Sequence, residues 1–331
     1  MQTRPLGAAG PTVSALGLGA MGMSDMYGPA DRTESIATVH AALDAGMTLI
    51  DTGDFYGSGH NEMLLAEALQ GVGRDRYQLS VKFGGLRGPD GGFVGYDNRP
   101  KSIKNFLTMS LRRLQADYID IYRPSRLDPE VPIEDVVGTI GEMVQAGYVR
   151  HIGLSEVGVD TIRKAAATHP ICDLQIEYSV ITRGIETAIL PACRELGIAI
   201  TAYGVLARGL ISGHWSKERQ AAGRDIRGFN PRFQGDNLDR NLGLAETLGQ
   251  MAGARGVTTA QLAIAWVAAQ GQDIFPLIGA RKRERLAEAL GAQAVALTPE
   301  DLAAIEAAIP RGAAAGDRYP TAMMAHLDSE K

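Results

Sequence analysis

Short apolar runs alternate with amphipathic stretches along most of this chain. From Thr33 onward, segments with apolar residues at helical spacing, such as Ile103, Leu107 and Leu111, lie between short runs rich in Val, Ile, Leu and Ala. This alternation is typical of parallel β-strands joined by helices, and it argues against an all-α or an all-β fold.

The short apolar runs predict eight parallel strands, preceded by a β-hairpin over residues 3–13. A helix between the first two strands is expected to end on a glycine cap at Gly46. The predicted strands are residues 15–18, 48–51, 78–82, 118–122, 151–154, 173–176, 198–202 and 274–277.

Eight repeats of strand and helix predict a closed (β/α)8 TIM barrel, an α/β fold. The sequence has no Pro/Ser-rich linker and no shift in composition, so we expect one barrel domain over residues 1–331 rather than a doubly wound sheet with a second domain. The longest irregular stretch is residues 204–236, after the seventh strand, and we interpret it as a lid.

Composition and charge narrow the possible partners. Hydrophobic residues make up 45% of the chain and charged residues 21%, which is typical of a globular protein with a large core. The net charge is −5 and the longest basic run is Arg281-Lys282-Arg283, so no nucleic-acid partner is expected. No apolar stretch is long enough to span a membrane, and the first ten residues do not resemble a signal peptide, so we expect a cytoplasmic location.

The two cysteines do not point to a disulfide or a metal. Cys172 falls at the start of a predicted strand and Cys193 in the middle of a predicted helix, without metal-type spacing to histidine. We expect reduced, structural thiols and no metal site.

Polar residues at the predicted strand ends indicate carbonyl chemistry. Asp51 ends the second strand in DTGDFYGSGHNE, Tyr56 follows in the loop, and Lys82 ends the third strand in LSVKFG. A lysine beside a phenol favours the phenolate, and a carboxylate keeps the ammonium charged, so the trio could make Tyr56 a proton donor. Taken singly, the aspartate could equally cap a helix and the tyrosine could simply be packed.

The sequences DTGDFYG and VKFG resemble the strand-two signature and strand-three lysine of the aldo-keto reductases, and the likeness extends from LGLGAMGMS to the RYP-containing tail. The resemblance implies that Tyr56 is the general acid/base, that Lys82 tunes it and that Asp51 pairs with Lys82. Gly53 stands where alanine is more usual. The implied activity is NADP(H)-dependent reduction or oxidation of an aldehyde, ketone or sugar-like carbonyl or alcohol, a small-molecule substrate.

One expected member of the catalytic set is absent. After the fourth strand the family usually carries a histidine followed by Arg, one further residue and Asp-Pro, whereas this chain reads IYRPSRLDP, with Ser125 at the histidine position. Either turnover of simple aldehydes is slow, or the pocket is enlarged for a particular substrate. A nicotinamide-binding redox sensor or regulatory barrel with vestigial turnover is the alternative function.

The pattern predicts a closed barrel, so a Rossmann cofactor site is not predicted and the cofactor must be held otherwise. Phosphate groups in barrels commonly bind at the loops after strands seven and eight, which here read AYGVLARGL and PLIGARKRERLAEAL. Arg281, Lys282 and Arg285 then lie at a helix start, where charge and free backbone donors suit a phosphate, although a solvated basic helix face is the alternative.

The same resemblance assigns the cofactor site and favours NADPH, with NADH possible, because two guanidiniums suit a 2′-phosphate. Glu156 replaces an asparagine found in many relatives. The cofactor-binding positions implied are Met21, Gly22, Ser155, Gln175, Tyr203, Leu206, Arg208, Gly209, Gly279, Ala280, Arg281, Arg285 and Glu288.

Overall fold

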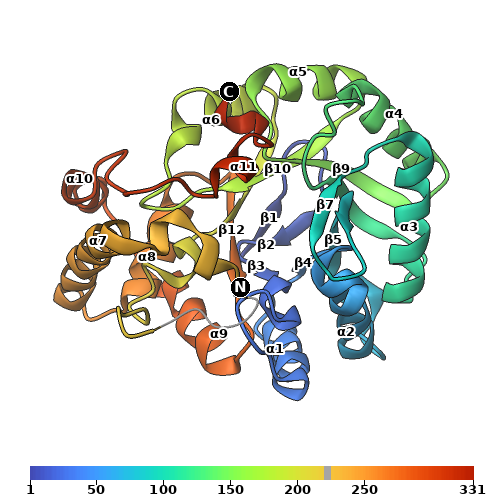
Figure 1. Cartoon of the computed structure of the whole chain (residues 1–331). Coiled ribbons are helices and arrows are strands. Elements are labelled where there is room, and N and C mark those ends of the chain that lie inside the picture. Colours follow the sequence, from blue (N-terminus) through green and yellow to red (C-terminus); the bar gives the residue numbers. More distant parts are fainter. Residues whose placement is uncertain (220–224) are drawn as a thin grey trace.

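Eight parallel strands form a closed barrel in the computed structural model, which describes residues 1–219 and 225–331 (Figure 1). The strands follow chain order around the barrel, and the last pairs with the first. This arrangement confirms the predicted (β/α)8 TIM barrel. The strands are β3 (Gly17–Gly19), β4 (Leu49–Gly53), β5 (Gln78–Phe83), β8 (Ile119–Pro124), β9 (Val149–Ser155), β10 (Ile171–Glu177), β11 (Ala199–Tyr203) and β12 (Ile274–Gly279).

Helices surround the barrel (Figure 1). Local signals define their ends: Thr258 and Gln261 form a capping box, and Gly46, with φ of 82°, follows the first helix as predicted. None of the described helices has the length and apolarity needed to cross a membrane. The helices are α1 (Arg32–Asp44), α2 (His60–Ala68), α3 (Pro100–Leu114), α4 (Ile133–Gln145), α5 (Val159–Thr168), α6 (Ile189–Glu195), α7 (Gly235–Ala254), α8 (Thr259–Ala269), α9 (Arg283–Leu290), α10 (Pro299–Ala308) and α11 (Thr321–Met324).

The predicted N-terminal hairpin is confirmed: β1 (Thr3–Pro5) pairs antiparallel with β2 (Thr12–Ser14). Leu6 and Val13 are fully buried in a cluster with residues of the barrel strands, including Leu49 and Phe275. Gly7 is required at the turn, because a Cβ there would lie 2.2 Å from a backbone oxygen and its φ is +71°. The hairpin therefore packs tightly against the amino-terminal end of the barrel.

Two segments differ from the sequence-based prediction. A second hairpin, β6 (Gly85–Arg87) with β7 (Phe93–Tyr96), follows β5 and was not predicted. The expected lid over 204–236 is less irregular than expected, because it contains short 3-10 turns. Helix α7 already begins at Gly235, because Leu238, Leu242 and Ala245 recur at helical spacing and pack against the core. Residues 220–224 of that stretch lie outside the described residues.

A buried ion pair crosses the barrel interior. Arg123 on β8 contacts Asp173 on β10 at 3.0 Å, and both side chains are fully buried. Arg123 also donates to Ser80 Oγ at 3.0 Å, and Thr201 donates to Asp173 at 2.5 Å. The predicted strand ends at residue 122 because the next residue, Arg123, is charged. Its buried pair with Asp173 lets β8 continue to Pro124. Both cysteines are free and buried, as predicted.

Candidate active site

The carboxyl ends of the strands bring the predicted catalytic residues together. Asp51 lies near the end of β4, Lys82 near the end of β5, and Ser125 directly follows β8. In barrels of this kind, reactive side chains are contributed by the ends of several strands on this face.

Asp51 and Lys82 form a buried ion pair, and their side chains are only 3% and 6% exposed. The other carboxylate oxygen of Asp51 accepts hydrogen bonds from Ser80 Oγ at 2.8 Å and Gln175 Nε2 at 2.7 Å. Burial lowers the pKa of Lys82, and the charge of Asp51 opposes that shift. Gln175, assigned to the cofactor amide by resemblance, is thus also tied to the Asp51–Lys82 pair.

Tyr56 lies in a tight 3-10 turn after β4, with Gly57 in the left-handed region at φ of 56°. Lys82 Nζ is 5.2 Å from the centre of the phenol ring. Among the described residues, none forms a hydrogen bond to the Tyr56 hydroxyl. Burial, followed by the charge of Asp51, raises the pKa of Tyr56 well above its usual value. Burial and Asp51 thus favour the protonated phenol, and the expectation that Lys82 favours the phenolate stays a prediction.

Ser125 is held by its backbone. Its N–H donates to the carbonyl of Phe83 at 2.8 Å, while its Oγ is buried and has no partner among the residues that the structure describes. The next residue, Arg126, donates to the Ser125 carbonyl at 2.5 Å and to the Tyr319 hydroxyl at 3.3 Å. Sequence analysis did not single out Arg126 or Tyr319.

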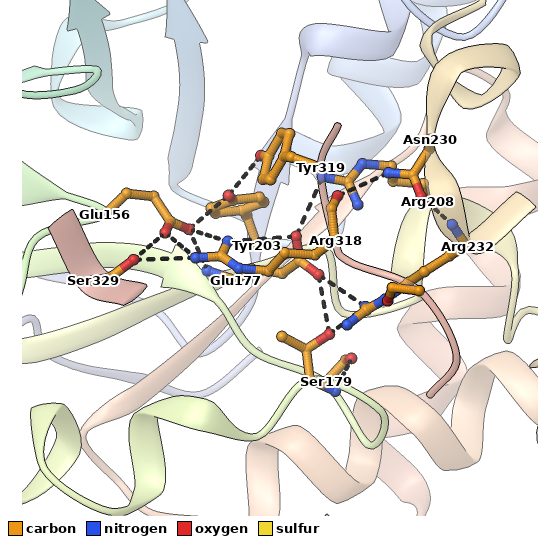
Figure 2. Close-up of polar contacts among 12 residues, drawn as sticks. Glu156, Glu177, Ser179, Tyr203, Arg208, Asn230, Arg232, Arg318, Tyr319 and Ser329 are labelled. Carbon is orange, nitrogen blue, oxygen red and sulfur yellow. Dashed lines mark hydrogen bonds and ion pairs between the residues drawn. The ribbon is translucent and has the colours of Figure 1, made fainter. Parts of the chain in front are cut away.

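The C-terminal tail contacts two residues of the site, Tyr203 and Glu156 (Figure 2). The Tyr203 hydroxyl donates to Glu156 Oε1 at 2.6 Å and lies 2.8 Å from the hydroxyl of Tyr319. Glu156 is fully buried and receives two hydrogen bonds from Arg318, at 2.9 and 2.5 Å. Burial alone would raise the pKa of Glu156, but Arg318 lowers it to about 2.

Glu177, at the end of β10, gathers further cations (Figure 2). Arg208 lies 3.2 Å from its carboxylate, Arg232 3.3 Å and Arg318 3.7 Å. The Arg208 guanidinium also covers the Tyr319 ring at 4.5 Å. Arg208, predicted to bind the cofactor pyrophosphate together with Leu206 and Gly209, is therefore already ion-paired in this structure.

The remaining positions assigned to the nicotinamide end also surround the barrel mouth. Ser155 ends β9, and its buried Oγ has no partner among the described residues. Met21 and Gly22 form a 3-10 turn directly after β3, and Tyr27 packs close to Gly22.

The segment after β12 carries the other predicted cofactor residues. Gly279 ends β12 and Ala280 is buried. Arg281 donates to the carbonyl of Gly28 at 2.6 Å. The predicted helix start is two residues too early, because α9 begins at Arg283.

The backbone donors expected to be free at this helix start are not all free. The Arg283 N–H donates to a carboxylate oxygen of Glu34 at 2.8 Å. Farther along α9, Arg285 and His214 both contact Glu288, at 3.1 and 2.9 Å. Any phosphate here would therefore be held mainly by side chains.

Four guanidiniums gather near this segment. Burial lowers the pKa of Arg219, and the charges of Arg227, Arg281 and Arg285 lower it further. Arg219 and Arg227 cover the ring of Trp215 at 4.8 and 4.6 Å. This basic cluster is defined as Arg219, Arg227, Arg281 and Arg285; within it, Arg227 is paired with Asp225 and Arg285 with Glu288.

Comparisons with known proteins agree with this geometry. A model of the Aldo/keto reductase family matches residues 15–310. A probable aldo-keto reductase from Glycine max is 41% identical over 322 residues, which cover 96% of this chain and 92% of that protein.

Two solved structures are also similar. A glycerol dehydrogenase from Gluconobacter oxydans matches with a TM-score of 0.83 and 27% identity, over 92% of this chain and 94% of that chain. An aldo-keto reductase from Klebsiella pneumoniae, solved in complex with NADPH, matches with a TM-score of 0.73 and 26% identity, over 97% of this chain and 100% of that chain. The chain therefore belongs to the aldo/keto reductase family and is an oxidoreductase of that kind.

Proposed function

We propose that this chain is an NADPH-dependent oxidoreductase that transfers a hydride between the nicotinamide and an aldehyde, ketone or sugar-like carbonyl, or the corresponding alcohol. Tyr56 serves as the general acid/base. The observation that carries the proposal is the buried Asp51–Lys82 pair lying beside the Tyr56 ring at the carboxyl end of the barrel.

Tyr56 is suited to give up a proton during carbonyl reduction. Its raised pKa keeps the phenol protonated at neutral pH, and its hydroxyl has no competing hydrogen bond within the described residues. As negative charge grows on the substrate oxygen, a donor aimed at that oxygen stabilises it. The Lys82 ammonium, 5.2 Å from the ring centre, then stabilises the charge that passes to the phenol.

Three residues at the barrel mouth have groups suited to the nicotinamide: two have unused hydrogen-bonding atoms and one has an aromatic ring. When bound, the cofactor supplies the hydride. The unpartnered Ser155 Oγ is available to a carboxamide, and Tyr203 provides an aromatic ring held by Glu156 and Tyr319. Gln175 retains its amide oxygen for the same group while its nitrogen donates to Asp51.

The basic cluster supports NADPH over NADH. Guanidiniums favour phosphate through charge and paired donors, and the cofactors differ by the 2′-phosphate. Arg281 and Arg285 are the members on the segment after β12, and the Klebsiella pneumoniae relative was solved with NADPH. Glu288, which lies beside Arg285, could contact the adenine or ribose of either cofactor, so use of NADH is also part of the proposal.

The proposal is tested by steady-state NADPH oxidation with a panel of aldehydes, ketones and sugars. Tyr56→Phe should bind NADPH, detected by quenching of protein fluorescence, but lose turnover by at least about 10²-fold. The matched control is Tyr148→Phe, an exposed tyrosine that should retain full activity. Equal turnover by Tyr56→Phe and the wild type would show that Tyr56 is not the general acid/base.

A second candidate function is a nicotinamide-binding redox sensor or regulatory barrel with vestigial turnover. The observation that favours it is Ser125, whose buried hydroxyl has no partner within the described chain at the position where relatives carry histidine. Tight NADPH binding without turnover of any compound in the panel would favour this function over the reductase.

A further inference from the structure

Arg126 is a cation of the site without a carboxylate partner. Its guanidinium donates to the Ser125 carbonyl at 2.5 Å and to the Tyr319 hydroxyl at 3.3 Å. Within residues 1–219 and 225–331, no carboxylate oxygen lies within 4.0 Å of its nitrogens. Both of its partners are neutral, so its charge is not compensated by direct contact.

Five other cations around the Tyr56 and Tyr203 side of the site are paired with carboxylates. Lys82 contacts Asp51, and Arg123 contacts Asp173. Two carboxylates engage the remaining guanidiniums: Glu156 binds Arg318, and Glu177 binds Arg208 and Arg232. A charge that is partly removed from water is costly unless an opposite charge or good hydrogen bonds compensate for it. Arg126, unlike these five cations, therefore has capacity for an added anion.

The groups around Arg126 do not supply an anion that would pair with it. Tyrosine side chains surround it: the Tyr319 ring centre is 5.8 Å from its guanidinium carbon, and its charge opposes the rise in the pKa of Tyr96 that burial causes. The charge of Glu156 is felt at Arg126, but that carboxylate is bound by Arg318, Tyr203 and Ser329. Phenol hydroxyls can donate to an anion, so the guanidinium and these tyrosines offer hydrogen-bond donors suited to one.

We propose that Arg126 binds a carboxylate of the substrate, so that the preferred substrates are carbonyl compounds that carry a carboxylate group. This inference rests on the proposed function. Arg126 follows Ser125 at the carboxyl end of β8, the same end of the barrel at which Tyr56 follows β4 and Lys82 lies near the end of β5. A carboxylate held by Arg126 therefore positions the carbonyl of the same molecule near Tyr56. Arginine pairs with carboxylates through two parallel hydrogen bonds, which gives orientation as well as affinity.

The test compares 4-carboxybenzaldehyde with its uncharged methyl ester, and succinic semialdehyde with its methyl ester, in NADPH oxidation. In the wild type, kcat/KM should be about tenfold or more higher for each acid than for its ester. In Arg126→Met this acid-to-ester ratio should fall about tenfold or more, mainly through KM, and Arg126→Lys should restore part of it. Arg150→Met is the matched control: Arg150 is an exposed arginine at the amino end of β9 and stacks on Tyr118, so the ratio should not change.

A direct measurement of carboxylate binding distinguishes the Arg126 carboxylate site from the proposed reductase activity. Succinate is titrated calorimetrically into the protein with and without NADPH, and Arg126→Met should weaken its binding about tenfold or more. Succinate binding that depends on Arg126 without turnover of any aldehyde would support the carboxylate site and contradict the reductase.

Two outcomes would overturn the carboxylate site and leave the reductase intact. The first is equal kcat/KM for acids and esters in the wild type. The second is an equal loss for acids and esters in Arg126→Met, which would place the guanidinium on the reacting oxygen instead.

Discussion

Arg318, in the C-terminal tail, holds the carboxylate of Glu156 at the end of β9 through hydrogen bonds of 2.9 and 2.5 Å, although the two residues are 162 positions apart. The same carboxylate accepts a hydrogen bond from the Tyr203 hydroxyl. The tail therefore helps to fix the Tyr203 ring, which is proposed to face the nicotinamide. The 5% exposure of the Arg318 side chain shows that this contact is internal to the fold (Figure 2).

Removing Arg318 should be strongly destabilising. Arg318→Met leaves the fully buried Glu156 carboxylate without its cation, which typically costs about 3–5 kcal/mol in the free energy of unfolding. Urea unfolding at neutral pH measures the loss, and the Glu156→Gln/Arg318→Met double variant should recover much of it. Arg163→Met, which breaks the exposed Arg163–Glu195 pair, serves as the control with little change expected. A loss no larger than that of the control would show that the buried pair does not stabilise the fold.

Two glycine-to-alanine substitutions should change the free energy of unfolding in opposite directions. At Gly153 a Cβ would lie 2.6 Å from Asp173 Oδ1 and 3.0 Å from Arg123 Nε, so Gly153→Ala should displace the ion pair inside the barrel and cost about 2–4 kcal/mol. Gly138 lies on the exposed face of α4 with nothing within 4 Å of its added Cβ, so Gly138→Ala should stabilise by about 0.5–1 kcal/mol. Thermal unfolding of both variants measures the difference, and a stable Gly153→Ala protein would argue against a rigid interior.

The barrel was predictable because its signals are local. Each strand is a short apolar run, and buried parallel strands need that pattern whatever surrounds them. The strand ends then place Asp51, Lys82 and Ser125 together, since the fold puts all carboxyl ends on one face.

The parts that were not predictable depend on distant residues or weak local patterns. The β6–β7 hairpin lies in the glycine-rich sequence GGLRGPDGGFVGY, where no apolar alternation marks the strands. The pairing of Arg318 with Glu156, and the lack of a carboxylate partner for Arg126 among the described residues, follow from the packing of the tail against the barrel mouth. No periodicity in the sequence carries that information.

Stability should depend on pH through Asp54, next to Phe55 in the loop that carries Tyr56. Burial, followed by the charge of Glu62, raises the pKa of Asp54 to about 8. The carboxyl group is protonated in the folded state but ionised in the unfolded chain between about pH 4 and pH 8. Asp54 therefore lowers the stability as the pH rises through this window, by up to about 1.4 kcal/mol per pH unit, with no further change above it.

Asp54→Asn should remove this dependence. The measurement is the free energy of unfolding of wild type and Asp54→Asn from pH 4 to pH 9, in steps of about one unit. The advantage of the variant should grow with pH and then level off above about pH 8. Parallel curves would mean that Asp54 binds no extra proton in the folded state.

Ser125, whose buried Oγ is unpartnered within the described chain, should contribute only weakly, because one serine hydroxyl is a weaker donor than the expected histidine. Ser125→Ala is therefore expected to change kcat by less than about threefold, whereas Ser125→His adds a donor where the substrate oxygen is proposed to lie and should raise kcat on small uncharged aldehydes about tenfold or more. Initial rates at saturating NADPH test both variants. A large loss in Ser125→Ala would instead assign the serine hydroxyl a role in the reaction.

The central claim, that this protein transfers a hydride while Tyr56 supplies the proton, is tested most directly by isotope transfer. NADPH that carries deuterium at both positions of the reactive nicotinamide carbon is incubated with a carbonyl substrate, and the product is examined by mass spectrometry for wild type and Tyr56→Phe. The account predicts one deuterium on the former carbonyl carbon in wild type, and product formation slowed by at least about 10²-fold in Tyr56→Phe despite retained NADPH binding. NADPH oxidation that leaves no deuterium in the product, or equal product formation by the two proteins, would contradict it.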